Sequence, residues 1–237
     1  MSEKIMQGCW LLDEIGVTGF QKEEQSSFIG GKPLLPQETD IPLCKLCGAE
    51  QTFYLQIAFP DKHVWTGLTL AVFSCTTCVD ENHLIPEMLN SSLNGADIPL
   101  HFLNEYQKNF RLLVFETSRG KLRRDYSEKI LYKPLYLRPL GNPSVVGNKV
   151  GGIPNWLLDD EAPRTYAIEH EMFFLLQLSS DTKFDILDSA PPQVELGLRG
   201  HPESSPNRYY QLFNGNEIYM FGVLGTEKPL VYVLTQT

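Results

Sequence analysis

The sequence predicts a mainly β protein, a β-rich α+β fold built from two pseudo-symmetric sheet halves. Three observations predict it: two Cys-x-x-Cys pairs around two apolar segments, an internal repeat at a spacing of 121 residues, and little helical periodicity. The 237 residues, 42% of them hydrophobic, suffice for one large domain or two small ones. We expect a single domain over 1–237, with a first repeat at about 26–140 and a second at about 149–237.

Four of the five cysteines form two pairs separated by 27 residues: Cys44, Cys47, Cys75 and Cys78. Two residues between cysteines allow one tight turn to direct both sulfurs at a single ion, and Zn²⁺ prefers four such ligands at tetrahedral corners. The pattern therefore predicts one zinc ion per chain. Disulfides, a redox pair and free thiols are the alternatives.

The spacer between the two pairs predicts an antiparallel hairpin. Residues 52–59 and 68–74 have the composition of strands, and residues 60–62 (Pro-Asp-Lys) are turn-like. A hairpin brings both pairs to the same end, as in a zinc ribbon. Because four thiolates leave no open coordination position, we expect a structural rather than a catalytic ion.

The two halves of the chain match when one is shifted by 121 residues. Eight of 27 aligned positions are identical, where unrelated sequence gives about one or two. The identical pairs are Gly30/Gly151, Gly31/Gly152, Pro33/Pro154, Pro42/Pro163, Glu50/Glu171, Phe53/Phe174, Leu55/Leu176 and Gln56/Gln177. This similarity indicates an internal duplication.

The similarity resumes beyond an insertion in the second half. Residues 67–73 match residues 215–221 at an offset of 148, so the second half carries 27 extra residues, within the range 179–214. We expect that range to be loop with a short strand near 194–198. The zinc-type cysteines have no counterpart in the second copy, so the repeated fold itself does not require the metal.

Each repeat places one glutamine, Gln56 or Gln177, on an apolar strand. A buried amide needs hydrogen-bond partners. Two interpretations stay open. The glutamines tie down the Gly-Gly loops, or they line a ligand-binding groove between the halves, to which Tyr54 or Glu171 could also contribute.

Local patterns predict a few further elements. Residues 4–14, 81–93 and 99–110 are candidate helices, the second broken by Pro86. Residues 130–137 resemble a strand interrupted at Pro134, which favours a sheet edge. Cys9, beside Trp10, is expected to be a buried and inert thiol.

Composition excludes several classes of function. The formal charge of −9 argues against nucleic acid as a ligand, and no apolar run reaches the roughly 18 residues of a membrane span. Residues 1–4 do not begin a signal peptide, so we expect a cytoplasmic protein that binds neither nucleic acid nor membrane. P-loop, HExxH, GxGxxG and nucleophile-elbow motifs are absent from the sequence, which offers no catalytic residues.

The quoted segments resemble the YwqG-like (DUF1963) family. The likeness covers roughly residues 26–75 and 149–236 and is most specific at 173–181 (FFLLQLSSD) and 231–236 (VYVLTQ). It implies a largely β fold with pseudo-twofold halves and no catalytic residues that could be transferred. Residues 27–78 are also similar to the zinc-binding part of the programmed-cell-death-protein-2 family, whose members escort a ribosomal protein.

These observations favour a non-enzymatic, zinc-containing domain that acts as an escort or adaptor by binding another protein. An acidic chain favours a basic partner. The alternatives are a small-molecule-binding protein or enzyme with a pocket between the halves, and an immunity protein that neutralises a basic toxin. The acidic loops at 159–161 and 181–188 are assigned no role.

Overall fold

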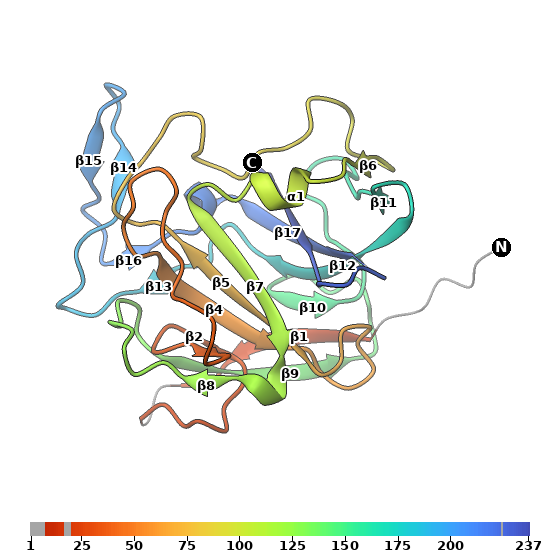
Figure 1. The fold of residues 1–237 in the computed structure, drawn as a ribbon, viewed down its shortest axis with the longest axis horizontal. Coiled ribbons are helices and arrows are strands. Elements are labelled where there is room, and N and C mark those ends of the chain that lie inside the picture. The colour runs from red at the N-terminus through yellow and green to blue at the C-terminus, as the bar shows by residue number, and fades with distance from the viewer. Residues whose placement is uncertain (1–7, 17–19, 224) are drawn as a thin grey trace.

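A computed structural model describes residues 8–16, 20–223 and 225–237 (Figure 1). The described chain is mostly strand and loop. Its strands are β1 (Cys9–Glu14), β2 (Phe28–Ile29), β3 (Leu34–Leu35), β4 (Thr52–Ala58), β5 (Leu68–Ser74), β6 (Asp97–Ile98), β7 (Phe110–Glu116), β8 (Lys121–Leu122), β9 (Lys133–Leu140), β10 (Lys149–Gly151), β11 (Thr165–Tyr166), β12 (His170–Leu178), β13 (Phe184–Asp185), β14 (Val194–Leu196), β15 (Pro202–Ser204), β16 (Tyr209–Tyr210), β17 (Glu217–Val223) and β18 (Val231–Gln236). One turn of helix, α1 (Phe102–Glu105), precedes β7.

A twelve-stranded sheet forms the body of the molecule. Its main path runs β18-β17-β12-β10-β1-β9-β2-β4-β5-β7, and every neighbouring pair on that path is antiparallel. Off this path, β11 pairs with β12 and with β6, and the β6–β11 pair is parallel. The predicted β-rich fold is confirmed.

The sheet is symmetric about its centre. On one side of the central β1–β9 pair lie β2, β4, β5 and β7, and on the other lie β10, β12, β17 and β18 in the same order outward. The central strands exchange neighbours: β1, which comes before β2 in the chain, pairs with β10, and β9, which comes before β10, pairs with β2. The two halves therefore share one continuous sheet.

Local irregularities repeat as well. The β4–β5 register shifts between Phe53 and Leu55, and the β12–β17 register shifts at the positions 121 residues later, between Phe174 and Leu176. The glycine pairs that precede these strands all have positive φ angles: 58° and 66° at Gly30 and Gly31, 66° and 74° at Gly151 and Gly152. These angles lie in the left-handed region that glycine adopts without strain.

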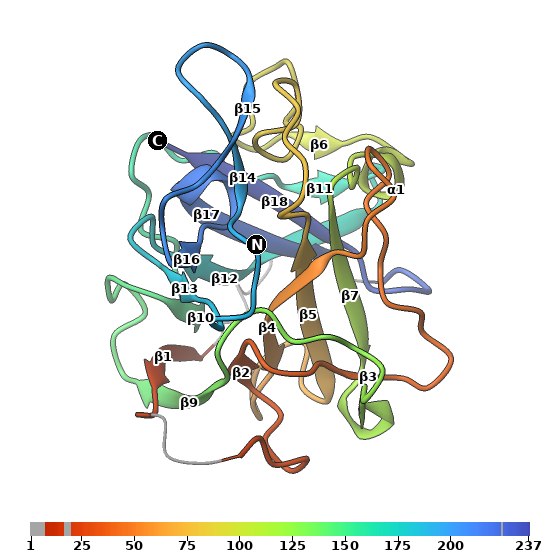
Figure 2. The same ribbon diagram turned by 90° about the vertical axis from the view of Figure 1, so that its left-hand side faces the viewer.

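The main hydrophobic core lies between the two halves and takes side chains from both of them. A second, smaller core lies on the other face of the first half, where segment 117–132 covers the sheet. Its buried members are Phe28, Leu34, Leu35, Phe53, Ala71, Phe73 and Tyr126. Strand β8 pairs with β3 in this half. Figure 1 shows β8 next to β2, and Figure 2 shows β2 and β3 at the same end of the molecule.

Two of the three helical predictions were wrong, and the third corresponds to a single helical turn. Residues 9–14 form strand β1, and residues 1–7 lie outside the described part of the chain. Residues 81–93 are turn and loop, and helix α1 spans only Phe102–Glu105 of the predicted 99–110. Sheet pairing overrides local helix propensity here, because β1 gains a hydrogen-bonded neighbour on both sides.

The prediction of an edge strand at 130–137 was also wrong, since β9 lies between β1 and β2 in the centre of the sheet. Pro134 is tolerated there because it pairs with Phe28 of β2, while pairing with β1 begins only at Leu135. The missing N–H therefore falls where one neighbouring strand has ended. The short strand expected near 194–198 is β14.

Among the described residues, no helix has the length and apolar character that crossing a membrane would need.

Candidate metal centre

The first cysteine pair lies on a tight turn between β3 and β4. The Gly48 N–H donates to the Cys44 carbonyl at 2.8 Å, and the Cys44 N–H donates to the Ala49 carbonyl at 2.8 Å. Gly48 has a φ of 77°, a conformation that few residues other than glycine adopt. The turn therefore folds back on itself within five residues and directs both sulfurs to one side.

The hairpin β4–β5 delivers the second pair to the same place. Thr52 at the start of β4 pairs with Ser74 at the end of β5, so residues 44–47 and 75–78 meet at one end of the hairpin. The Thr52 and Thr76 hydroxyls are 2.8 Å apart and hydrogen-bonded, which fixes the exit of β5. The predicted antiparallel arrangement is confirmed.

The four sulfurs form a compact cluster. Sγ–Sγ distances are 3.8 Å for Cys44–Cys78, 3.7 Å for Cys47–Cys75 and 3.5 Å for Cys75–Cys78, and all four atoms lie within 4.8 Å of one another. Four sulfurs at about 2.3 Å from a central ion define a tetrahedron with an edge of about 3.8 Å. These separations exceed the roughly 2.05 Å of a disulfide, and the cysteines are free thiols. The site can hold one metal ion.

The cluster is also tied to the next strand of the sheet. The Lys45 N–H donates to the Lys108 carbonyl at 2.9 Å, and the Cys75 N–H donates to the Asn109 carbonyl at 2.8 Å. Residues 108–109 lead directly into β7, which pairs with β5 along its whole length. Both cysteine turns thus contact a third segment of chain, whereas a ribbon of two strands would leave them unsupported.

The thiols differ in their tendency to ionise without metal. Burial raises the pKa of Cys44 and, together with hydrogen bonds to neighbouring thiols, that of Cys78. Burial also opposes ionisation of Cys47, but hydrogen bonds from the Ala49 backbone and from the neighbouring side chains lower the pKa of Cys47 to about 7. A metal must displace protons from these thiols, so its affinity falls as the pH falls.

Basic side chains surround the first turn, a feature that the sequence analysis missed. Burial and then repulsion from Arg111 and Lys108 lower the pKa of Lys45, so these three cationic side chains lie close to one another beside the first turn. Lys108 and Arg111 are more than 60 positions away in the chain, and only the β5–β7 pairing brings them here.

The two glutamines hold equivalent loops in the two repeats. Gln56 accepts a hydrogen bond from the Leu34 N–H at 3.1 Å, and Gln177 accepts one from the Asn155 N–H at 2.9 Å. Leu34 and Asn155 are themselves 121 residues apart. Both glutamine side chains are buried, and their amide groups also donate to carbonyl or carboxylate oxygens. These contacts are the ones expected if the glutamines tie down the loops that follow the Gly-Gly pairs.

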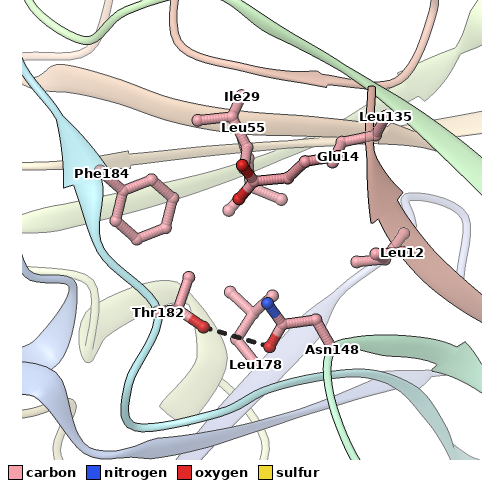
Figure 3. Close-up of a pocket in the computed structure, with 9 residues that line it drawn as sticks. All are labelled: Leu12, Glu14, Ile29, Leu55, Leu135, Asn148, Leu178, Thr182 and Phe184. Atoms are coloured by element: carbon pink, nitrogen blue, oxygen red, sulfur yellow. Dashed lines mark hydrogen bonds between the residues drawn. The ribbon is translucent and has the colours of Figure 1, made fainter. Parts of the chain in front are cut away.

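A small pocket lies between the halves, and neither Gln56 nor Gln177 lines it (Figure 3). Its volume is about 50 Å³. The lining residues are Leu12, Glu14, Ile29, Leu55, Leu135, Asn148, Leu178, Thr182 and Phe184. The Glu14 carboxylate points into the pocket and is paired with Lys133 at 2.9 Å. Neither Tyr54 nor Glu171, which were expected at such a groove, belongs to the lining.

The remaining candidate groups are accounted for by local contacts. Cys9 is buried as predicted, and burial raises the pKa of its thiol. His83, which is close in sequence to Cys78, pairs instead with Asp80 at 2.7 Å. Within the described chain, the cysteine cluster is the one group of potential metal ligands that converges on a point.

Comparisons with family models, with curated proteins and with solved structures find no match to this chain.

Proposed function

We propose that Cys44, Cys47, Cys75 and Cys78 hold one Zn²⁺ as a structural ion. Thiolate sulfur is a ligand that zinc prefers, and the sulfur separations of 3.5–3.8 Å suit its tetrahedral geometry. Four protein ligands leave no position for water or substrate, so this ion stabilises the fold rather than performing chemistry. Free thiols of this kind fit a reducing compartment, and we place the protein in the cytoplasm.

The function that this site supports best is that of a non-enzymatic adaptor or escort that binds another protein. The observation that carries the proposal is the closed set of four sulfur donors. The resemblance of residues 27–78 to the zinc-binding part of the programmed-cell-death-protein-2 family, whose members escort a ribosomal protein, points the same way. The formal charge of −9, made more negative by a tetrathiolate zinc site, favours a basic partner.

The experiment has two arms. Elemental analysis of the purified protein is expected to give about one zinc per chain. Immobilised zinc-loaded protein should then recover a specific basic partner from native lysate at physiological salt, and protein carrying Cys44→Ser should recover less of it. Absence of any partner at physiological salt would contradict the adaptor function, whatever the metal content.

The pocket between the halves supports a second candidate, a small-molecule-binding role. Its lining comes from both repeats and includes a carboxylate and an amide (Figure 3). However, a volume of about 50 Å³ is well below the roughly 300–1,000 Å³ of typical ligand sites. Thermal-shift screening against a metabolite library tests this role, since a ligand in excess raises the melting temperature.

A further inference from the structure

In the first repeat, the loop that follows Pro33 is covered by the chain itself. Strand β3 pairs with β8, with Leu34 opposite Leu122 and Leu35 opposite Lys121. The Arg123 N–H extends the pairing by donating to the Pro33 carbonyl at 3.0 Å. Leu34 is consequently only 6% exposed and Leu35 is fully buried.

The covering segment is basic, and the loop beneath it is acidic. Arg119 forms an ion pair with Glu38, and Arg123 donates to the Thr39 carbonyl. Leu122 packs against the second core between these charges. The Arg-Gly-Lys-Leu-Arg segment at 119–123, extended from Gly120 onward, thus combines strand pairing, an apolar contact and charge complementarity.

The second repeat has the same loop in the same backbone setting. Residues 154–161 stand 121 positions after residues 33–40, and Gln177 holds the Asn155 N–H as Gln56 holds that of Leu34. The Asn155 carbonyl accepts hydrogen bonds from Gln177 and Tyr219, so both backbone polar groups of Asn155 have partners within the chain. Its neighbours Pro154 and Trp156 occupy the positions that face β8 in the first repeat.

No segment of the described chain pairs with Pro154 and Trp156 in the way that β8 pairs with the first repeat. Among the described residues, the Pro154 carbonyl and the Trp156 N–H and carbonyl make no hydrogen bond. Leu157 is 54% exposed, although its counterpart Pro36 is buried, and the neighbouring Leu158, at the position of the exposed Gln37, is 63% exposed. A loop with open backbone groups next to exposed apolar side chains is a surface to which an extended chain can add.

The charges on this loop also lack the partners that the first repeat provides. Asp159 and Asp160 correspond to Glu38 and Thr39, and both are exposed. Neither forms an ion pair within the described residues, and the nearby Glu161 carboxylate accepts only from Gln236. An incoming segment with cationic side chains would meet unpaired carboxylates.

We propose that residues 154–160 are the docking surface for an extended basic segment of the partner protein, which adds to this loop as residues 119–123 add to the first repeat. The segment carries an apolar residue between cationic ones, since its template within this chain is Arg-Gly-Lys-Leu-Arg. This inference rests on the proposed function, that the protein acts by binding another protein. It adds the surface and the chemistry of the bound segment.

The test uses a fluorescent peptide with the sequence of residues 117–124 and the whole, zinc-loaded protein. Fluorescence anisotropy is expected to show saturable binding. Leu158→Glu combined with Asp159→Lys should weaken it at least about tenfold, as should Leu122→Asp in the peptide. Glu24→Lys, a similar charge reversal on an exposed residue of the first repeat, should change the affinity less than about twofold.

Hydrogen exchange then locates the bound peptide. Protection is expected in fragments covering 153–160 and not in those covering 33–40. No binding at about 1 mM peptide, equal weakening by the Glu24 variant, or protection at 33–40 through displacement of β8 would each overturn the proposal.

The two proposals fail in different ways. If the partner recovered from lysate binds the Leu158→Glu, Asp159→Lys variant as well as it binds wild type, the docking surface is wrong and the adaptor function stands. If wild-type protein recovers no partner, the adaptor function itself fails, even where the peptide binds.

Discussion

The Gln56 side-chain amide accepts a hydrogen bond from the Leu34 N–H at 3.1 Å in the fully buried interior of the first repeat. The same bond recurs between Gln177 and Asn155, 121 residues further on. A single buried side chain thus fixes the backbone of each loop that follows a Gly-Gly pair. Loops without regular secondary structure need such side-chain partners for their buried N–H groups.

Replacing either glutamine by leucine should destabilise the protein. Gln56→Leu leaves the Leu34 N–H and the Ser26 carbonyl without partners, at a cost of about 1–3 kcal/mol for each buried group. Urea unfolding measures the loss. Gln37→Leu, at an exposed glutamine in the same loop, should change stability by less than about 0.5 kcal/mol. Equal effects of the two substitutions would contradict a loop-holding role.

Cys44→Ser should abolish stoichiometric zinc binding. A ligand at a thousand times its Kd stabilises a protein by about 4 kcal/mol, so loss of tight zinc binding should lower the melting temperature by many degrees. Calorimetry with and without chelator, together with elemental analysis, measures both effects. The matched control is Cys9→Ser, which also alters a buried thiol but should retain one zinc per chain. Full metal content in Cys44→Ser would disprove the assigned ligand set.

His63 should make folding stability fall between about pH 6.5 and pH 4. Its ring is 2% exposed, stacks on Phe59 at 4.5 Å, and accepts the Trp65 N–H at 3.0 Å. Burial lowers the pKa of His63 to about 4, while the unfolded chain keeps about 6.5. The unfolded state therefore binds the proton first as the pH falls, and stability drops by up to about 3 kcal/mol.

The measurement for His63 is the difference in unfolding free energy between wild type and His63→Asn at pH 7.5 and at pH 4.5. Asparagine keeps an acceptor for the Trp65 N–H but does not titrate. Loss of zinc at low pH affects both proteins, so the difference isolates the histidine. A difference that does not change with pH would exclude His63 as the source.

Gly30→Ala should be far more damaging than Gly67→Ala. Both glycines have positive φ angles, 58° and 80°, so each substitution costs about 1–2 kcal/mol in backbone strain. At Gly30 the new Cβ would also lie 2.6 Å from the Ile130 carbonyl oxygen, whereas at Gly67 no atom lies within 4 Å. Denaturant midpoints compare the two. Equal losses would show that the close backbone packing at Gly30 is not required.

The sequence alone determined the β-rich class, the meeting of the two Cys-x-x-Cys turns at one end of a hairpin, and the internal repeat. These follow from local patterns: alternation of apolar residues, turn residues at fixed offsets, and identities at constant spacing. The same patterns misassigned as helix residues 9–14 of the predicted segment 4–14 and all but residues 102–105 of the predicted segment 99–110. Short segments with mixed propensity take their structure from the neighbours they pair with, and those neighbours are distant in sequence.

Only the tertiary structure decided how the halves combine. The pairing of β1 with β10 and of β9 with β2 joins residues more than 100 positions apart, and no local pattern encodes that choice. Likewise, only the β5–β7 pairing brings Lys108 and Arg111 next to Lys45, and only the β3–β8 pairing covers Leu34 and Leu35 while the equivalent part of the 154–160 loop stays uncovered. Hydrogen bonding between strands depends on which edges meet in space, so surfaces and charge environments emerge only once the whole sheet has formed.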